Sequence, residues 1–350
     1  MKTVFIVDDC EINLLIVKDA LDGIYETFIM QSAMEMFKAA EKKLPDLILL
    51  DVSMPQVDGF EAIRMLKSDA KLKSVPVVFL TAHNDAASEI RGFELGAVDF
   101  IYKPCSPPVL VKRIETHIEM DKVIKRSQAA VRETHNATIR VIADMVESRD
   151  KVTGGHIWRT QLYLEILVKE LVRRGIYADE IKNWDFSLLF PSSQLHDVGK
   201  IAISDTVLNK PGKLTDEEFK LIQTHCSHGE DIIDQIITTT KDDGFLHHAK
   251  MFAGYHHEKW NGKGYPRGLS GEDIPLEGRV MAIADVYDAL VCERPYKKPF
   301  THEKAVEIIK NDSGAHFDPK IVDTFLGVAD NFNSMLTLTN ASAVKKWENV

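Results

Sequence analysis

The chain has 350 residues, of which 45% are hydrophobic and 27% are charged, and its formal net charge is −10. This composition is typical of folded globular proteins, excludes disorder and low-complexity repeats for most of the chain, and at this length predicts two domains. The acidic balance argues against a nucleic-acid duplex or an anionic membrane as the main partner.

We expect no targeting signal in this sequence. No apolar run approaches the ~20 residues of a membrane-spanning helix, so we expect no membrane partner. The first apolar run turns acidic at Asp8 and is too short for a secretory signal. The four cysteines are far apart and form no Cys-x-x-Cys pair, as expected in a reducing cytosol. We therefore expect a cytoplasmic protein.

Residues 1–120 alternate short apolar runs with amphipathic segments. The runs are Val4–Val7, Leu47–Leu50, Val75–Leu80 and Val98–Ile101. Such continuous runs are typical of parallel strands that are covered by helices on both faces. The alternation predicts an α/β doubly wound parallel sheet with a functional site beyond the carboxyl ends of its strands.

Polar side chains stand where these strands are expected to end, at Asp8, Asp9, Asp51, Thr81 and Lys103. Three converging carboxylates repel one another and favour a divalent cation. A lysine and a hydroxyl beside them can contact the oxygens of a phosphoryl group. Acidic residues also cap helices, but five groups at successive strand ends favour a site.

These residues lie in motifs that resemble the receiver domain of two-component response regulators. The motifs are Asp51-Val-Ser53-Met54-Pro55-Gln-Val-Asp58-Gly59, Thr81-Ala82 and Phe100-Ile-Tyr102-Lys103-Pro104. The resemblance implies a five-stranded, flavodoxin-like sheet, phosphorylation of Asp51 by a sensor histidine kinase, and Mg²⁺ beside the phosphorylated residue. It also implies that the Mg and phosphoryl contacts are Asp8, Asp9, Ser53, Thr81 and Lys103, and that Phe100 is the switching aromatic residue.

Residues 106–150 lack glycine, and their prolines stand only at the beginning, where a helix tolerates them. Apolar residues recur there at intervals of three, four or seven. We predict that the last receiver helix continues into a connecting helix over residues 121–150. The polar stretch Lys125–Asn136 leaves room for a break. The apolar face of this helix predicts either a homodimer or a merely intramolecular helix.

From about residue 154 onward the apolar spacing is helical, as in Trp158–Arg174 and Arg279–Val291. No parallel-sheet strands are expected. We predict an all-α domain over residues 151–330, with irregular structure around Trp260–Pro275, and we assign no motif to residues 331–350.

Most of the thirteen histidines lie in this second half. The positions that stand beside other plausible ligands are His156, His196-Asp197, His225, His256-His257 and Asp285. Imidazoles with a few carboxylates are the ligand set of Fe, Mn, Zn or Ni. An aspartate can bridge two metals ~3.5–4 Å apart and leave an acidified water between them. Each histidine alone is more simply a surface or core residue, and we leave His228, His247 and His248 as surface residues and His316 unassigned.

Two motifs strengthen the metal interpretation. Leu195-His196-Asp197-Val198-Gly199-Lys200-Ile201 and His256-His257-Glu258-Lys-Trp-Asn-Gly262-Lys-Gly264-Tyr265-Pro266 resemble the HD-GYP family of HD-superfamily metal phosphohydrolases. The resemblance implies hydrolysis of cyclic dinucleotides, chiefly cyclic di-GMP, to linear pGpG and in some members onward to GMP. It implies two divalent metals, with Fe or Mn favoured.

The resemblance also implies roles for individual residues. The implied metal ligands are His156, His196, Asp197, His225, His256, His257 and Asp285. Asp197 would bridge the metals, a bridging water would attack phosphorus, and Lys200 would orient the water or the phosphate. Arg294 and Lys297 would contact phosphates, and Tyr265 would border the nucleotide pocket.

The chain departs from the family pattern at one point. Some members carry a glutamate four residues before the first histidine, which supplies a third metal, but that position is Val152 here. Glu147 lies too far back for the same helical position, although another route to the site remains open to it. We therefore expect two metals rather than three.

The leading hypothesis is a cyclic di-GMP phosphodiesterase that is controlled by phosphorylation of Asp51, with the direction of control open. One alternative is hydrolysis of hybrid 3′,3′-cyclic GMP-AMP. Another is a signalling adaptor with a vestigial site, which the complete ligand set disfavours. A general HD nucleotidase is disfavoured by the paired His256-His257.

Overall fold

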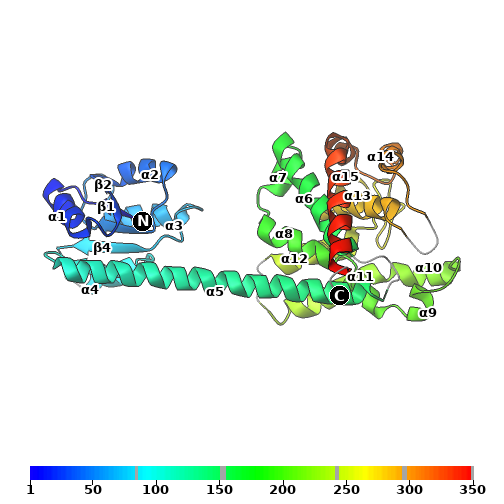
Figure 1. Ribbon diagram of the computed structural model, residues 1–350, viewed down its shortest axis with the longest axis horizontal. Coiled ribbons are helices and arrows are strands. Elements are labelled where there is room, and N and C mark those ends of the chain that lie inside the picture. The colour runs from blue at the N-terminus through cyan, green and yellow to red at the C-terminus, as the bar shows by residue number, and fades with distance from the viewer. Residues whose placement is uncertain (83–85, 150–154, 241–243, 294–297, 348–350) are drawn as a thin grey trace. The chain divides into compact units, whose positions relative to one another are not determined.

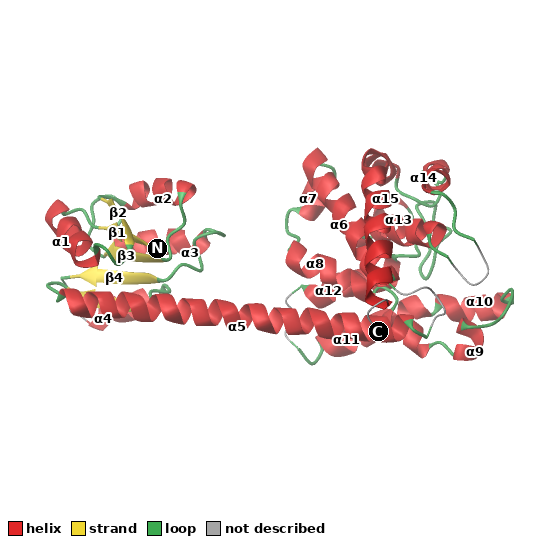
Figure 2. Ribbon diagram, viewed as in Figure 1, coloured by secondary structure: helices red, strands yellow, loops and turns green. Residues whose placement is uncertain are grey.

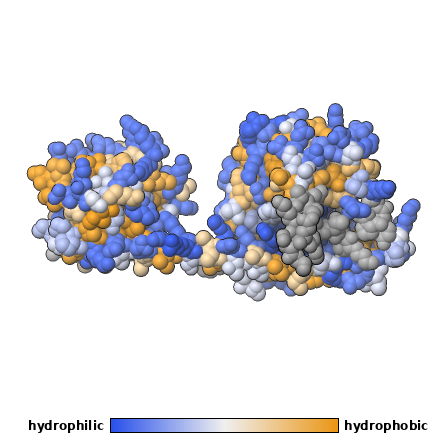
Figure 3. Space-filling model, in the orientation of Figure 1, coloured by the Kyte–Doolittle hydropathy of each residue, from blue (hydrophilic) through white to orange (hydrophobic). Residues whose placement is uncertain are grey.

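The computed structural model describes residues 1–82, 86–149, 155–240, 244–293 and 298–347. The chain forms two compact units, Met1–Arg132 and Glu133–Val350 (Figure 1). The division between them falls inside the stretch that the sequence predicts as a connecting helix. Each unit has its own hydrophobic core, and hydrophilic and hydrophobic residues both occur on its visible surface (Figure 3).

The first unit is a five-stranded parallel sheet with strand order β2-β1-β3-β4-β5, which confirms the predicted fold class (Figure 2). The strands are β1 (Thr3–Val7), β2 (Glu26–Met30), β3 (Leu47–Asp51), β4 (Val77–Thr81) and β5 (Asp99–Tyr102). The helices that alternate with them are α1 (Glu11–Leu21), α2 (Ala33–Lys42), α3 (Gly59–Ser68) and α4 (Ala86–Glu94). Every residue of β1, β3 and β4 is buried, because apolar clusters cover both faces of the sheet.

Helix α5 (Pro107–Glu147) runs without interruption for 41 residues, so the break considered at Lys125–Asn136 does not occur. Ile114 and Ile118 are buried near its beginning and Val146 near its end. Apolar side chains elsewhere on the helix stay exposed, such as Val131 at 68%. Dimerisation through them stays a prediction. Within the described residues no helix is both long enough and apolar enough to cross a membrane.

The second unit is helical, and the predicted all-α architecture is confirmed for its described residues (Figure 2). Its α-helices are α6 (His156–Arg174), α7 (Ala178–Ile181), α8 (Phe186–Ser192), α9 (Asp205–Leu208), α10 (Asp216–Gln223), α11 (His225–Ile237), α12 (Phe245–Tyr255), α13 (Leu276–Val291), α14 (His302–Asn311) and α15 (Pro319–Trp347). Its 3-10 helices are η1 (Ser193–Leu195), η2 (Val198–Ala202) and η3 (Gly271–Asp273).

The core of this unit forms where α6, α13 and α15 pack together. The rings of Tyr163, Tyr287 and Phe332 contact one another at its centre and are fully buried. Phe332 belongs to the stretch 331–350, to which the sequence assigned no motif. That stretch therefore contributes to the core through α15.

Glycine is required at one contact that positions the histidines. Gly199 of η2 faces the beginning of α11 so closely that a Cβ atom there would lie 1.9 Å from the carbonyl oxygen of His225 and 2.5 Å from the nitrogen of Gly229. Both neighbours are backbone atoms and cannot rotate away. The absence of a side chain at Gly199 therefore lets the turn after Asp197 approach α11.

We expect Gly199→Ala to destabilise the protein by about 1–3 kcal/mol or more, because the methyl group overpacks a rigid backbone contact. The free energy of unfolding in urea measures this. Gly271→Ala is the matched control, since nothing lies within 4 Å of the added atom and only the positive φ of 59° opposes it, at about 1 kcal/mol. Equal losses in the two variants would contradict the steric explanation.

Candidate metal centres

The predicted acidic site lies at the carboxyl edge of the sheet. Asp8, Asp9 and Asp51 bring carboxylate oxygens within 4.8 Å of one another. The ammonium of Lys103 lies 2.9 Å from Asp51 Oδ1 and 2.5 Å from Asp8 Oδ2. Burial raises the pKa of Asp51 despite this ion pair. Burial alone would lower the pKa of Lys103, but its bonds to Asp8 and Asp51 raise it. The cluster can hold a divalent cation through oxygen ligands.

Three further receiver predictions are located at or near this edge. Thr81 ends β4 and is buried, whereas Ser53 is exposed after β3. Phe100 is buried, with its ring centroid 5.1 Å from those of Phe79 and Phe93. The side chain of Phe100 occupies the space beside Gly92, where a Cβ atom would lie 2.3 Å from the ring.

The second unit gathers all seven predicted ligands in two clusters. One consists of Asp197, His225, His256 and His257, and the other of His156, His196 and Asp285. They come from the starts of α6 and α11, the turn between η1 and η2, the residues just after α12, and the middle of α13. Within each cluster the ligand atoms lie within 4.8 Å of one another.

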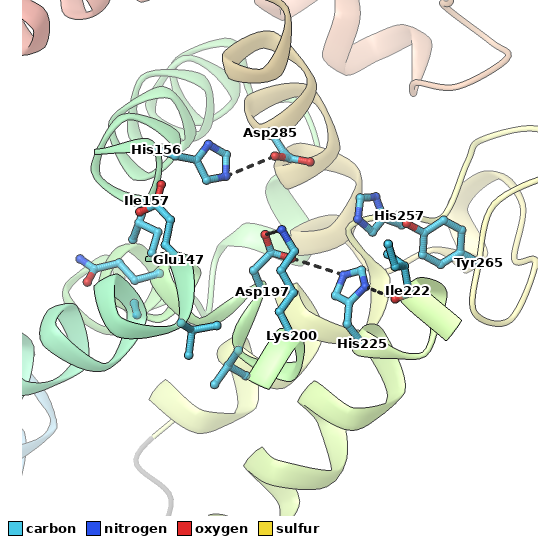
Figure 4. Close-up of a pocket in the computed structure, with 14 residues that line it drawn as sticks. Glu147, His156, Ile157, Asp197, Lys200, Ile222, His225, His257, Tyr265 and Asp285 are labelled. Carbon is cyan, nitrogen blue, oxygen red and sulfur yellow. Dashed lines mark hydrogen bonds and ion pairs between the residues drawn. The ribbon is translucent and has the colours of Figure 1, made fainter. Parts of the chain in front are cut away.

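Asp197 lies between the two clusters. Its Oδ1 is 3.3 Å from His225 Nε2 and 3.7 Å from His256 Nε2, while its Oδ2 is 3.5 Å from His196 Nε2. The two carboxylate oxygens thus face different clusters. On the other side of the pocket, His156 Nε2 lies 3.4 Å from Asp285 Oδ1 (Figure 4).

Hydrogen bonds at Nδ1 orient three of these imidazoles. Nδ1 lies 2.9 Å from the Ser193 carbonyl oxygen in His196, 2.7 Å from that of Ile222 in His225, and 2.8 Å from that of Phe252 in His256. A carbonyl only accepts, so each Nδ1 carries the proton and donates it. Nε2 is then left with a free lone pair facing the cluster, which is the usual arrangement of metal-ligating histidines.

The protonation states also suit metal binding. Burial lowers the pKa of His225 and of His256 to about 4, so both are neutral near pH 7. Burial by itself would raise the pKa of Asp197, but Lys200 and the neighbouring histidines hold it well below its usual range. His196 Nε2 and Asp197 Oδ1 are buried and form no hydrogen bond with the described part of the chain. Such atoms are costly unless something coordinates them, so this donor set fits metal ions.

A buried ion pair between Asp288 and Arg159 supports the ligand His156. The sequence did not predict this pair. Asp288 Oδ2 lies 2.8 Å from His156 Nδ1, and Arg159 donates to Asp288 from Nε (2.7 Å) and Nη2 (2.9 Å). Burial alone would raise the pKa of Asp288, but His156 and Arg159 lower it to about 2. Helical spacing could have revealed both residues, since each stands three positions after a predicted ligand and so shares its helix face.

The clusters open into a pocket with a volume of about 180 Å³ (Figure 4). Lys200 and Tyr265 line this pocket. The Lys200 ammonium lies 2.8 Å from Asp197 Oδ2, and the Tyr265 ring packs 4.7 Å from the ring of His257. Arg294 and Lys297, together with Val152, lie outside the described residues.

Glu147, at the end of α5, lines the wall of the pocket, by the other route that the sequence left open to it. One sequence expectation needs correction. His248 is buried rather than on the surface, with Nδ1 2.9 Å from Glu277 Oε1. A polar residue on α12 finds a carboxylate on α13 there, a pairing that local sequence does not reveal. His247 is exposed, and His228 and His316 are half-buried.

Comparisons with known proteins match both units. The HD domain family matches residues 140–321, and the response regulator receiver domain matches residues 4–115. A Vibrio cholerae protein named "Probable cyclic di-GMP phosphodiesterase" is 37% identical over 345 residues, which cover 94% of this chain and 78% of that protein. The "Cyclic di-GMP phosphodiesterase response regulator RpfG" of Xanthomonas campestris is 32% identical, over 80% of this chain and 75% of its own length. The "3'3'-cGAMP-specific phosphodiesterase 2" of Vibrio cholerae is 42% identical over 58% of this chain and 36% of that protein.

We expect Asp288→Asn to lower metal affinity by about 10- to 100-fold, because His156 loses the carboxylate that orients it. Removing one partner of a buried ion pair should also cost about 3–5 kcal/mol of stability. Competition with a chelator measures the first effect and urea unfolding the second. Asp179→Asn, on a side chain that is 98% exposed, is the control. Wild-type metal affinity in the Asp288 variant would contradict the orienting role.

Proposed function

The chain belongs to the HD domain family and carries a response regulator receiver domain, and from this premise we propose that it is a metal-dependent phosphodiesterase that hydrolyses cyclic di-GMP to linear pGpG. The relatives that match both units over most of their length, from Vibrio cholerae and Xanthomonas campestris, are named as cyclic di-GMP phosphodiesterases. The relative named for cyclic GMP-AMP matches a smaller share of the chain. This difference favours cyclic di-GMP as the substrate.

One observation carries the proposal: seven ligand side chains, distant in sequence, form two clusters, and the carboxylate of Asp197 lies between them. His156, His196 and Asp285 would hold one cation, and His225, His256 and His257 the other, with Asp197 bridging them. The nitrogen-rich donor set favours Fe or Mn over Mg or Ca. The chemistry that such a pair supplies is the acidification of a water and the neutralisation of charge on a phosphate.

The other pocket residues would bind and orient the substrate. The Lys200 ammonium at the Asp197 carboxylate is placed to contact a scissile phosphate as a point charge. The Tyr265 ring, packed on His257, offers an apolar face on which a guanine can stack. Arg294 and Lys297 would contact further phosphates through charge-assisted hydrogen bonds.

We expect Asp197→Ala to abolish turnover of cyclic di-GMP and to lower the bound metal per chain, because both clusters lose their shared carboxylate. Rates with cyclic di-GMP, 3′,3′-cyclic GMP-AMP and cyclic di-AMP, under anaerobic Fe²⁺ and with Mn²⁺, should rank cyclic di-GMP first. Metal analysis accompanies each rate. Asp231→Ala, at an exposed position on α11, is the control.

Two outcomes would reject parts of this proposal. A folded, metal-loaded wild type without turnover of any cyclic dinucleotide would favour a signalling adaptor. Faster turnover of cyclic GMP-AMP than of cyclic di-GMP would keep the metal chemistry but change the substrate.

A phosphodonor such as a histidine kinase would control this activity through the receiver unit. Asp51 would accept the phosphoryl group, with Mg²⁺ held by Asp8, Asp9 and Asp51. Lys103, which now pairs with Asp8 and Asp51, would contact the phosphoryl oxygens together with Ser53 and Thr81. Phe100 would be the switching residue, because rotation of its ring out of the space beside Gly92 would change the surface of the receiver unit.

We expect Asp51→Asn to leave the metal content of the HD domain unchanged and to remove the change in turnover that acetyl phosphate and Mg²⁺ produce in the wild type. The amide keeps the shape of the carboxylate but does not accept the phosphoryl group. Intact-mass measurement reports phosphorylation independently of turnover. Asp22→Asn, on an exposed residue after α1, should respond like the wild type. An undiminished response in the Asp51 variant would show that control does not pass through Asp51.

A further inference from the structure

The turn that carries Lys200 is a short piece of 3-10 helix. Lys200 lies in η2, a 3-10 helix of five residues. Its internal backbone bonds include Lys200 N to the Asp197 oxygen (3.0 Å) and Ile203 N to the Lys200 oxygen (3.0 Å). Short 3-10 turns have poor hydrogen-bond geometry. The position of the Lys200 side chain therefore depends on groups outside the turn.

The guanidinium of Arg149, which stands 51 residues before Lys200, is such a group. Its Nη1 donates to the carbonyl oxygen of Ile201 (2.8 Å), and its Nη2 donates to that of Ile203 (3.0 Å) and to Asp205 Oδ1 (2.9 Å). Its Nε lies 3.2 Å from the same carboxylate oxygen, and its Nη1 lies 3.5 Å from the Lys200 oxygen. A planar guanidinium with five donors can hold several acceptors at once, which a lysine cannot do.

The contact is reciprocal and lies at the end of α5. The side-chain amide of Asn209 donates to the carbonyl oxygen of Arg149 at 2.7 Å. Arg149 stands two residues after Glu147, where α5 ends. Ala143, Val146 and Glu147 of the same helix end line the metal pocket, where Figure 4 shows Glu147 beside Ile157. The end of α5 thus forms one wall of the pocket and also holds the turn that carries Lys200.

We propose that Arg149 is a positioning residue that sets the place of Lys200 relative to Asp197 and couples this place to the end of α5. The inference rests on the proposed function, which gives Lys200 its role, and deepens it by naming how the site is regulated. The Lys200–Asp197 contact of 2.8 Å is short enough that a shift of about 1 Å breaks it. A misplacement of that size can cost about 100-fold in rate. A shift of α5 along its axis would pass to Lys200 through the guanidinium.

The test uses the full chain with Arg149→Lys and Arg149→Gln. We expect kcat to fall about 10- to 100-fold with KM changed less than about threefold, because Lys200 acts on the scissile phosphate while the other substrate-binding residues stay in place. Metal content should equal that of the wild type, since all seven candidate ligands are retained. Backbone amides of residues 199–205 should exchange hydrogen faster, and the response to acetyl phosphate should shrink. Arg126→Lys, at an exposed position on α5, is the matched control for charge and helix.

Hydrogen exchange separates failure of this inference from failure of the proposed function. A wild type that hydrolyses no cyclic dinucleotide rejects the proposed function, while exchange at residues 199–205 still reports whether Arg149 holds the turn. Unchanged exchange in both Arg149 variants overturns the inference. Faster exchange with wild-type kcat also overturns it, because Arg149 would then be structural only.

A milder variant serves if both Arg149 variants fail to fold. Asp205→Asn removes the ionic partner and keeps the bonds from Arg149 to the carbonyl oxygens. We expect it to raise exchange at residues 199–205 and to lower kcat by about two- to fivefold. Wild-type exchange and kcat in this variant would overturn the inference.

Discussion

The arrangement of the second unit depends on one half-buried carboxylate, that of Asp197. Asp197 faces one cluster with Oδ1 and the other with Oδ2. Oδ1 is buried, and burying a carboxylate charge is costly unless neighbouring groups compensate it. Lys200 compensates part of the charge from one side. Asp197 Oδ1 and His196 Nε2 have no hydrogen-bond partner in the described part of the chain, and the other inward-facing imidazole nitrogens are also suited to coordinate cations. Coordination of cations satisfies all of these atoms at once, which ties the stability of the unit to the contents of its site.

Helix ends and tight turns orient three of the ligand imidazoles. The carbonyl oxygens of Ser193, Ile222 and Phe252 each accept from a histidine Nδ1, and each lies three or four residues before that histidine. Each of these carbonyl oxygens also accepts a backbone N–H, and its second lone pair is left for the imidazole. A histidine placed at a helix end or in a tight turn can therefore donate from Nδ1 to that oxygen and turn Nε2 inward. His156, at the first turn of α6, has no such carbonyl and relies on Asp288 instead.

The sequence predicted the sheet, the helical second unit and the residues that form the clusters, because each depends on local patterns: apolar runs, helical spacing and adjacent ligand pairs. It did not reveal β2, whose residues are only partly buried and break the continuous apolar pattern. It also missed Asp288, Arg159 and the partner of His248. Helical spacing places Asp288 and Arg159 on the same helix faces as predicted ligands, but their pairing joins helices that are distant in sequence, and only the structure shows it. The same holds for the pairing of His248 with Glu277.

Helix α5 shows why an interrupted apolar pattern was misleading. Its polar middle, Lys125–Asn136, suggested a break, yet the helix continues because no glycine or proline interrupts its backbone hydrogen bonds. Residues 125–135 are exposed. The stretch is therefore polar because its side chains face solvent, not because the helix ends there. Buried residues resume at Ile139, where the helix enters the core of the second unit. Arg149, two residues beyond the end of α5, joins this packed end to the turn that carries Lys200.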